Sequence, residues 1–580
     1  MGASRVGFGL RAVFVLMAGT ALTAPASAWA QPAPGPAVAA AARAGPSAPE
    51  LNPAARLPRA QPVESDVFAP EPAGPCPLAD SPVEVTLQSV TFRGATALTS
   101  QDFAAAYREF IGKPQKVGVI CQIRDRAARA LFDRGVLARV ESPEQRISGG
   151  TLVLEVIEAH VVNVRVRGDA GPGQAAVEAY VEKLRGMKPF DMRKAQRYLL
   201  LASDVPGIRV RAAVKPSTSP ERGAVDIDVS VSRTPLQVVG NVQNFGSRAV
   251  GRWGGLVRAD ARGYTTLGED TSLVAFHTLD SNEQWVVQLL EAARIGGDGW
   301  IVRGSAVYGE SRPGDVLKPL GLKSTSAVGE VEAAYPLIRH RRLNVNLAGG
   351  FDLVDQETDV GGAGAPLTQD RIRVLYLRAD GDARPFVMDR TVLLSGSASL
   401  RKGLSGLGAS DRGSPLLTRS LSQPDAWLVR IAGGADAPFA GRFGASLRVQ
   451  AQYTDKPLTP YEQFSLGDLT VGRGYDPAVA LGDTGAAASL DLHYSAAPLN
   501  RFIQAAPFAF FDAGYVHNND AAASGLPPHR TLRSVGAGVV LRLVNRANLE
   551  LTYAYPLDST TVGGERAAPR LLVNLTASFL

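Results

Sequence analysis

The sequence predicts a transmembrane antiparallel β-barrel preceded by two α+β domains. Three observations support this fold class. Only 20% of the 580 residues are charged and 60 are glycine, with a mean hydropathy close to zero. The C-terminal part alternates apolar and polar residues, and no later apolar run is long enough for a spanning helix. A two-fold repeat precedes it. This pattern suits strands with one face to lipid and one to water, although composition alone also allows a large secreted all-β protein.

The N-terminus has the features of a secretory signal peptide over residues 1–30. Two arginines precede an apolar run at residues 12–22, and small residues follow at Ala28 and Ala30. The run is about half the roughly 20 residues that a transmembrane helix needs. We therefore expect cleavage after Ala28 or Ala30, rather than an uncleaved anchor, and export of the remaining chain.

Residues 31–75 are rich in proline and alanine. Such a segment cannot bury enough apolar surface to offset the entropy lost on ordering, so we expect a flexible periplasmic leader. The two cysteines of the chain, Cys76 and Cys121, follow it. In an oxidising compartment they form a candidate disulfide, with two free thiols as the alternative. A disulfide that closes the chain between Cys76 and Cys121 would stabilise the domain by about 4 kcal/mol.

Charge and motif content argue against other classes of protein. The formal net charge is +6, but lysine and arginine are spread along the chain, so we expect no nucleic-acid partner. The six histidines are scattered and suggest no metal site. Since Gly-x-Ser-x-Gly, His-Glu-x-x-His, phosphate-loop and Cys-x-x-Cys motifs are missing, we expect neither an enzyme nor a bound cofactor.

A two-fold repeat organises residues 76–233. The short strand at 90–94 is echoed at 164–168, and each ends at a glycine. Two helical patterns and two strand patterns follow in each copy, which is typical of a small α+β module. In the first copy we expect helices from Thr99 or Ser100 to Ile111 and over 121–134, then strands over 136–141 and 151–159. In the second we expect helices over 173–184 and 191–202, then strands over 208–214 and 224–232.

From residue 234 to 580, period-two strands replace the helical signal. Leu447 and Val449, for example, face one way, while Arg448 and Gln450 face the other. Charges on the second face of several strands are too many to bury in a dry core. A water-filled lumen with the apolar face against lipid satisfies both faces. The length suits about sixteen strands, and fourteen or eighteen would also fit.

The last strand carries a signal of its own. Residues 571–579 alternate and end in Phe579, with Leu580 following. A terminal strand ending in an aromatic residue resembles the signal recognised by bacterial barrel-assembly machinery, although Leu580 is a small departure from it. An ordinary last strand with an incidental phenylalanine is the alternative.

These patterns divide the chain into five parts. We expect a signal peptide over 1–30, a flexible periplasmic leader over 31–75, a first α+β domain over 76–159, a second over 160–233, and an outer-membrane β-barrel over 234–580.

Several segments match one known family in the same order. They are residues 134–140 and 199–208 of the repeat, and two barrel motifs, Gly472-Arg473-Gly474-Tyr475 and Phe510-Phe511-Asp512-Ala513-Gly514. With these segments the chain resembles the two-partner secretion transporters (TpsB type, the ShlB/FhaC/HecB hemolysin secretion/activation proteins). The resemblance covers nearly everything from Cys76 to Leu580, and we find no clear version of the N-terminal plug helix of some members.

The resemblance implies two periplasmic POTRA domains and a sixteen-stranded barrel in the cell outer membrane. It places Arg473 at the tip of a long extracellular loop that folds back into the lumen, with Gly472 where valine is usual. We expect a salt bridge from Arg473 to Asp512 on the barrel wall. Gly474 would permit a tight turn, and Tyr475 would pack on the wall. A surface arginine and an unrelated aspartate are the alternative.

The resemblance also implies a function. The POTRA domains would capture an unfolded TpsA-type exoprotein, of the adhesin or hemolysin class, by adding an extended segment to a sheet edge. The barrel would then translocate it. A barrel-assembly insertase of the related branch, or a passive porin, is the alternative; two repeats argue against the former, and a peptide-capturing domain against the latter. Outer-membrane lipid and barrel-assembly machinery are the other expected partners.

Overall fold

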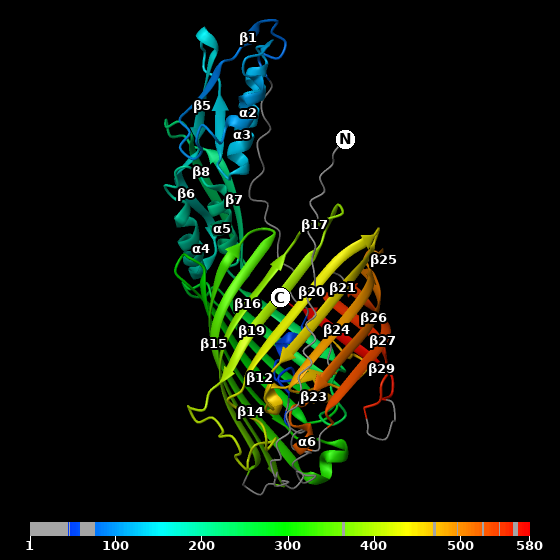
Figure 1. Ribbon diagram of the computed structural model, residues 1–580. Coiled ribbons are helices and arrows are strands. Elements are labelled where there is room, and N and C mark those ends of the chain that lie inside the picture. Colours follow the sequence, from blue (N-terminus) through cyan, green and yellow to red (C-terminus); the bar gives the residue numbers. More distant parts are fainter. Residues whose placement is uncertain are drawn as a thin grey trace, which may run out of the picture. The chain divides into compact units, whose positions relative to one another are not determined.

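The computed structural model describes residues 45, 47–57, 76–361, 366–467, 471–495, 497–524, 527–543, 546–560 and 567–579 (Figure 1). The expected signal peptide over 1–30 lies outside these residues. In this part of the chain, no helix is both long enough and apolar enough to cross a membrane.

The first α+β domain is a three-stranded sheet with helices packed on it. Its elements are β1 (Glu84–Thr86), β2 (Ser89–Arg93), α2 (Ala104–Tyr107), η2 (Arg108–Phe110), β3 (Pro114–Lys116), α3 (Val119–Asp133), β4 (Ala138–Glu141), η3 (Ser148–Gly150) and β5 (Thr151–Glu158). The sheet has the order β2-β5-β4, with β2 parallel and β4 antiparallel to β5. Helix α3 buries Ile123, Ala127 and Leu131 in the core, because these residues share one helical face.

The second α+β domain repeats the strand, two helices and two strands of the first, without counterparts of β1 and β3, which pair as a separate two-stranded sheet. Its elements are β6 (His160–Asp169), η4 (Gly171–Gly173), α4 (Gln174–Val181), η5 (Glu182–Leu184), α5 (Met192–Ser203), β7 (Ile208–Pro216) and β8 (Ala224–Arg233). Its sheet has the order β6-β8-β7, with β6 parallel and β7 antiparallel to β8. Asp191 caps α5 by accepting the backbone N–H groups of Arg193 and Lys194. The sequence repeat therefore corresponds to two units with one topology.

The first helix of the repeat is shorter than expected. In place of a helix from Thr99 or Ser100 to Ile111, α2 has four residues and η2 follows it. Thr99 donates its backbone N–H and its hydroxyl to Asp102, over 2.9 and 2.7 Å. This local side-chain turn competes with helical hydrogen bonding at the start of the segment.

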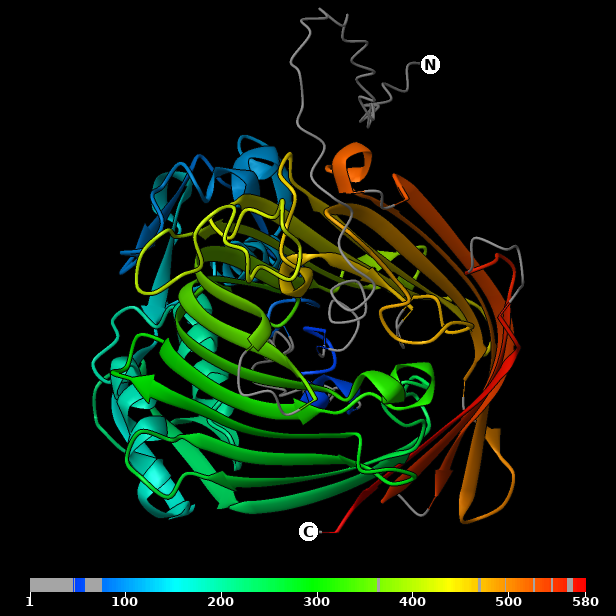
Figure 2. The ribbon, with the colours of Figure 1, turned by 90° about the horizontal axis from the view of Figure 1, so that it is seen from below.

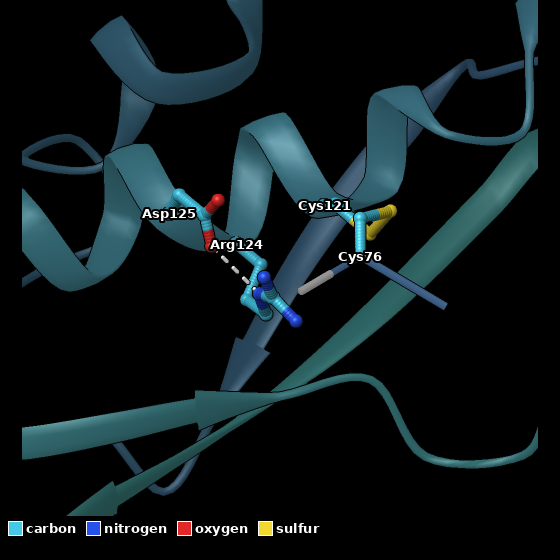
Figure 3. Close-up of a disulfide and its surroundings, with 4 residues drawn as sticks. All are labelled: Cys76, Cys121, Arg124 and Asp125. Atoms are coloured by element: carbon cyan, nitrogen blue, oxygen red, sulfur yellow. Dashed lines mark hydrogen bonds and ion pairs between the residues drawn. A yellow bond between two sulfur atoms is a disulfide. The ribbon is translucent and has the colours of Figure 1, made fainter. Parts of the chain in front are cut away.

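Cys76 and Cys121 form a disulfide in the structure (Figure 3). Cys121 lies in the first turn of α3 and is buried. Beside it, Nε of Arg124 lies 2.7 Å from Oδ1 of Asp125. The bridge ties the segment ahead of β1 to the main helix of the first domain.

Sixteen antiparallel strands form a closed barrel, as predicted, and Figure 2 looks into the ring that they form. They are β9 (Leu236–Gln243), β10 (Gly254–Arg262), β11 (Asp270–Thr278), β12 (Gln284–Ile295), β13 (Trp300–Ser311), β14 (Leu322–Arg339), β15 (Leu343–Val360), β16 (Pro366–Ala383), β19 (Leu393–Gly403), β20 (Trp427–Ala440), β21 (Phe443–Tyr453), β24 (Thr484–Tyr494), β26 (Ile503–His517), β27 (His529–Leu543), β28 (Ala547–Pro556) and β29 (Arg570–Ser578). Three short pieces lie beside them: β17 (Phe386–Val387), β18 (Arg390–Thr391) and β25 (Ala497–Pro498). The remaining short elements are η6 (Asp315–Leu320) and α6 (Ala521–Ser524).

The apolar face of each strand points outward and the polar face points into the lumen. On β21, Leu447 and Val449 are 43% and 42% exposed, whereas Ser446 and Gln452 are buried. Many buried side chains of the wall are charged and paired, such as Glu332 with Arg378. This arrangement confirms the predicted orientation, because a lipid-facing exterior and a polar interior satisfy both faces of every strand.

The barrel closes where β29 meets β9. Five residue pairs join these strands, fewer than the eight that join β9 to β10. The side chain of Asn241 reinforces the junction by donating to Oγ1 of Thr576 over 2.8 Å. Phe579 follows β29, donates its N–H to the carbonyl of Val238 over 2.9 Å, and leaves its ring exposed. The candidate assembly signal thus lies at the closing junction.

Part of the leader differs from the flexible periplasmic segment that its composition predicts. Residues 47–57 form turns and η1 (Pro53–Arg56). Leu51 is buried against Leu256 and Phe276, on the inner face of β10 and β11. This dark-blue segment lies inside the ring in Figure 2. Average composition conceals such a local apolar anchor, whose burial favours binding to an apolar patch of the wall.

Removal of the disulfide is expected to destabilise the first domain and leave the barrel intact. The double variant Cys76→Ser/Cys121→Ser should lower the domain's free energy of unfolding by about 4 kcal/mol, because the unfolded chain regains its loop entropy. The urea concentration at which residues 84–158 become sensitive to protease in the purified full chain measures this loss. An unchanged urea midpoint would refute the expectation, and unaltered heat-modifiable gel migration is the control for barrel folding.

Candidate functional site

Residues 454–467 and 471–483, the described part of the loop between β21 and β24, lie on the inner wall of the barrel; we call this loop the inner loop. It contains η7 (Pro460–Glu462), β22 (Phe464–Leu466) and β23 (Ala480–Gly482). Strands β22 and β23 pair with each other and not with the barrel sheet. Leu466 and Tyr475 form a buried cluster with Val516 of β26 and Leu532 of β27. Side chains, rather than a shared β-ladder, therefore attach this loop to the wall.

Arg473 of the inner loop is buried among carboxylates of the wall. Its Nη2 lies 2.7 Å from Oδ1 of Asp512 and 2.7 Å from Oδ1 of Asp491. Its Nε lies 3.2 Å from Oδ2 of Asp512, and Nη2 also donates to Oγ of Ser489 over 2.9 Å. Ser489 and Asp491 belong to β24 and Asp512 to β26. One planar guanidinium thus bridges two neighbouring strands.

Asp512 collects most of the hydrogen bonds in this site. It has no exposed surface. Besides Nε and Nη2 of Arg473, it accepts the backbone N–H groups of Gly472 and Arg473, over 3.1 and 3.0 Å, and the hydroxyl of Ser534 over 3.1 Å. A buried carboxylate without such donors would carry a large desolvation cost. Four of the five donors to Asp512 therefore come from the inner loop.

The spacing of the Phe-x-Asp-x-Gly motif has a direct structural reason. Residues at alternate positions of β26 share one face, so Phe510, Asp512 and Gly514 all point into the lumen. The ring centroid of Phe510 lies 3.6 Å from Cζ of Arg473, a cation–π contact. A Cβ at Gly514 would lie 2.4 Å from a methyl carbon of Leu466. Each motif residue thus contacts or accommodates the inner loop.

The two glycines of the loop motif have different roles. Gly472 has a φ of 87°, in the left-handed region that disfavours a β-branched residue. This conformation explains glycine at a position where valine is usual, and the neighbouring Val471 is buried in the loop cluster. Gly474 lies in the expected tight turn, which the N–H of Tyr475 closes by donating to the carbonyl of Gly472 over 2.9 Å, but its φ is not positive. A Cβ there would lie 2.9 Å from Cβ of Ser534, so Gly474 allows close approach to the wall.

Tyr475 packs on the wall, buried to 1% exposure. Its hydroxyl donates to the carbonyl of Arg533 over 2.7 Å and accepts the N–H of Asp558 over 2.9 Å. Burial raises the pKa of this hydroxyl above its ordinary value. The ring and its polar end therefore fix the loop to two successive segments of the wall.

Several partners of the loop were not predicted from the sequence. Asp491 stands alone between Leu490 and Leu492, and an acid within an apolar strand was a signal that could have identified it. The carboxylate of Glu462, in η7, forms ion pairs with Arg401 of β19 and Arg430 of β20, at N–O distances of 2.7 and 3.0 Å. No local pattern could have revealed this contact, because it joins strands far apart in the chain.

The tip of the inner loop also reaches the closing junction of the barrel. Asp476 lies 3.2 Å from Nη1 of Arg252, just ahead of β10, and 3.5 Å from Nη1 of Arg570 at the start of β29. Arg570 also donates to the carbonyl of Tyr475. The loop therefore contacts the wall along an arc from β19 to the junction. Among the described residues, no cluster of His, Cys, Asp and Glu suits a metal ion.

Comparisons with known proteins agree with this architecture. Residues 223–543 match the family model "Haemolysin secretion/activation protein ShlB/FhaC/HecB", and residues 85–159 match "POTRA domain, ShlB-type". No curated protein matches the sequence.

Two solved structures are similar in fold. CdiB from Escherichia coli has a TM-score of 0.73 at 16% identity, covering 89% of this chain and 94% of its own. CdiB from Acinetobacter baumannii has a TM-score of 0.64 at 14% identity, covering 90% and 93%.

Asp512 and Asp491 are expected to differ in their importance for the loop. Asp512→Asn should weaken loop attachment by roughly 3–5 kcal/mol, since it removes the buried charge that five donors share. Asp491→Asn should cost roughly 1.5–3 kcal/mol, because one charged hydrogen bond from Arg473 is weakened. Hydrogen exchange at residues 471–476 of the purified protein measures both effects. Equal exchange rates in the two variants would contradict this ranking.

Proposed function

The chain belongs to the ShlB/FhaC/HecB family of haemolysin secretion/activation proteins, and we propose that displacement of its inner loop from Asp512 opens the lumen for the exported polypeptide. It is a transporter of the two-partner secretion type, located in the outer membrane with its POTRA region in the periplasm. Its partner is a secreted exoprotein of the TpsA type. What we propose is how the inner loop and the barrel wall act together during transport.

The attachment of the inner loop carries this proposal. The loop occupies part of the lumen, yet β22 and β23 form a separate two-stranded sheet. It can therefore leave the wall without breaking the barrel's backbone ladder. Its tip depends on Arg473, whose acceptors Asp491 and Asp512 stay behind on strands. Water entering the opened lumen would solvate all three charges, which lowers the cost of their separation.

We further propose that the exported chain enters through the α+β domains as an added strand. Each three-stranded sheet has two edge strands, β2 and β4 in the first domain and β6 and β7 in the second. Edge strands offer unpaired backbone groups to an extended peptide. The exported protein would be of the adhesin or hemolysin class, and its folding outside the cell would drive transport without a catalytic step or cofactor. Barrel-assembly machinery would insert the barrel into the lipid of the outer membrane.

Substitution of Arg473 provides the direct test. Arg473→Ala is expected to abolish secretion of the partner, to below about a tenth of the normal level, because the buried pair contributes several kcal/mol to the loop position. Barrel insertion should remain normal, since no ladder hydrogen bond involves this side chain. Partner protein in the culture medium is the readout, with heat-modifiable migration in isolated outer membranes as the measure of insertion.

Arg303→Ala is the matched control. Arg303 is also an arginine of the lumen, paired with Glu332 over 2.7 Å, but it lies on β13 and contacts no residue of the motif. The Arg303→Ala variant should secrete the partner protein at the normal level. Normal secretion by Arg473→Ala would reject the proposed role of the loop. Depletion of the whole protein separates the alternatives: loss of one secreted protein indicates the transporter, and general loss of outer-membrane barrels indicates an insertase.

A further inference from the structure

A second buried ion cluster lies at the root of the inner loop, apart from the Arg473 site. At its centre is Arg419, 8% exposed, in the loop of residues 404–426 that joins β19 to β20. Its guanidinium contacts two carboxylates, Asp483 with no exposed surface and Asp520 at 8%. Neither sequence motif includes any of these three residues.

The hydrogen bonds of this cluster are extensive. Nη2 of Arg419 donates to Oδ2 of Asp483 over 2.9 Å, and Nε donates to Oδ2 of Asp520 over 2.9 Å. Nη1 donates to the carbonyl of Leu458 over 3.0 Å and also contacts Oδ1 of Asp483. Burial opposes the charge of Arg419, but the hydrogen bonds to Asp483 and Asp520 outweigh it and raise the pKa of the guanidinium.

Asp483 joins both ends of the inner loop. It lies at the loop's C-terminal end and accepts the backbone N–H of Leu458 over 2.8 Å and Nε2 of Gln463 over 3.1 Å, both near the N-terminal end. It also accepts the N–H of Asn519 over 2.8 Å, from the loop between β26 and β27. One carboxylate therefore closes the root of the loop and ties it to a neighbouring loop.

The root and the tip differ in what they are attached to. At the tip, Arg473 belongs to the inner loop, and its acceptors Asp491 and Asp512 stand on barrel strands. At the root, Arg419 comes from outside the inner loop, and its partners Asp483 and Asp520 lie beyond the strand ends. Separation at the tip therefore leaves every contact of the root intact.

We propose that Arg419 is a positioning residue that holds the root of the inner loop in place while the tip moves. The loop would then pivot about its root, instead of leaving the barrel as a whole. The loops that carry Arg419 and Asp520 form one fixed unit with this root, because Arg419 and Asp483 connect all three. The inference rests on the proposed displacement of the loop tip, but it concerns a separate set of residues.

Hydrogen exchange of the purified full chain in lipid nanodiscs can test this pivot. The root is read from residues 456–463 and the tip from residues 471–476. Arg473→Ala is expected to accelerate exchange at the tip on the order of tenfold or more, with the root within about twofold of the unmodified protein. Arg419→Gln is expected to accelerate exchange at the root on the order of tenfold or more, because Asp483 and Asp520 lose their shared cation.

Arg412→Gln is the matched control on the same loop. Arg412 pairs with Asp425 through two contacts of 2.6 Å, but its side chain is 59% exposed. Because an exposed pair contributes little, root exchange in this variant should stay unchanged. Arg419→Lys provides a milder variant for the case in which Arg419→Gln does not fold. Lysine keeps the positive charge but lacks the planar guanidinium that binds two carboxylates at once. The exchange rate at the root should therefore be faster than in the unmodified protein, but by less than tenfold.

Two results would overturn the proposal. The first is hydrogen exchange at the root that is as slow in Arg419→Gln as in the control Arg412→Gln. If only Arg419→Lys folds, the same result is exchange at the root that is as slow in Arg419→Lys as in Arg412→Gln. The second is an Arg473→Ala variant in which root and tip accelerate equally, which means that the loop is released as a whole. Secretion is measured separately: normal secretion by Arg473→Ala rejects the role of the tip, whereas the exchange pattern alone decides whether Arg419 holds the root.

Discussion

Asp512, a residue with no exposed surface, stands on the inner wall of this barrel, and the inner loop supplies four of the five hydrogen-bond donors to its carboxylate. Two backbone N–H groups and the guanidinium of Arg473 reach it from the loop. The neighbouring residues follow from this requirement. Phe510 stacks on the same guanidinium, and Gly514 leaves room for Leu466. The barrel wall and the loop are therefore complementary, and each is incompletely satisfied without the other.

The same electrostatic logic extends across the lumen. Many charged residues on the inner face are paired within the wall or with the inner loop, as Arg401 and Arg430 are with Glu462. In a closed barrel the backbone groups of each strand are already paired. Side-chain charges are consequently available to attach the inner loop to the wall, as Arg473 does with Asp491 and Asp512. This division would let the wall stay intact during the displacement that we propose for the inner loop.

Some of the site was accessible to sequence reasoning and some was not. Arg473 and Asp512 could be paired through the resemblance of their motifs, and alternation placed Asp512 on a polar face. Asp491 had a weak signal, as a single acid in an apolar strand. Arg419 had none, because its partners Asp483 and Asp520 are distant in the chain and belong to different loops. Gly474 lies in the turn that the sequence predicts, but its close approach to Ser534 could not be predicted, because it depends on how the loop packs on the wall.

The sequence by itself determined the period-two strands, the repeated α+β module, the lipid-facing and water-facing sides, and the identities of the loop motifs. The strands, the repeat and the two faces depend on local periodicity and composition, which act within a few residues, whereas the loop motifs were identified by their resemblance to a known family. Tertiary structure alone decided that Leu51 lies inside the barrel, that Asp491 shares Arg473, and that Arg419 joins three loops. The reason is physical: barrel closure brings together side chains from distant strands, and their contacts depend on distances that no local pattern encodes.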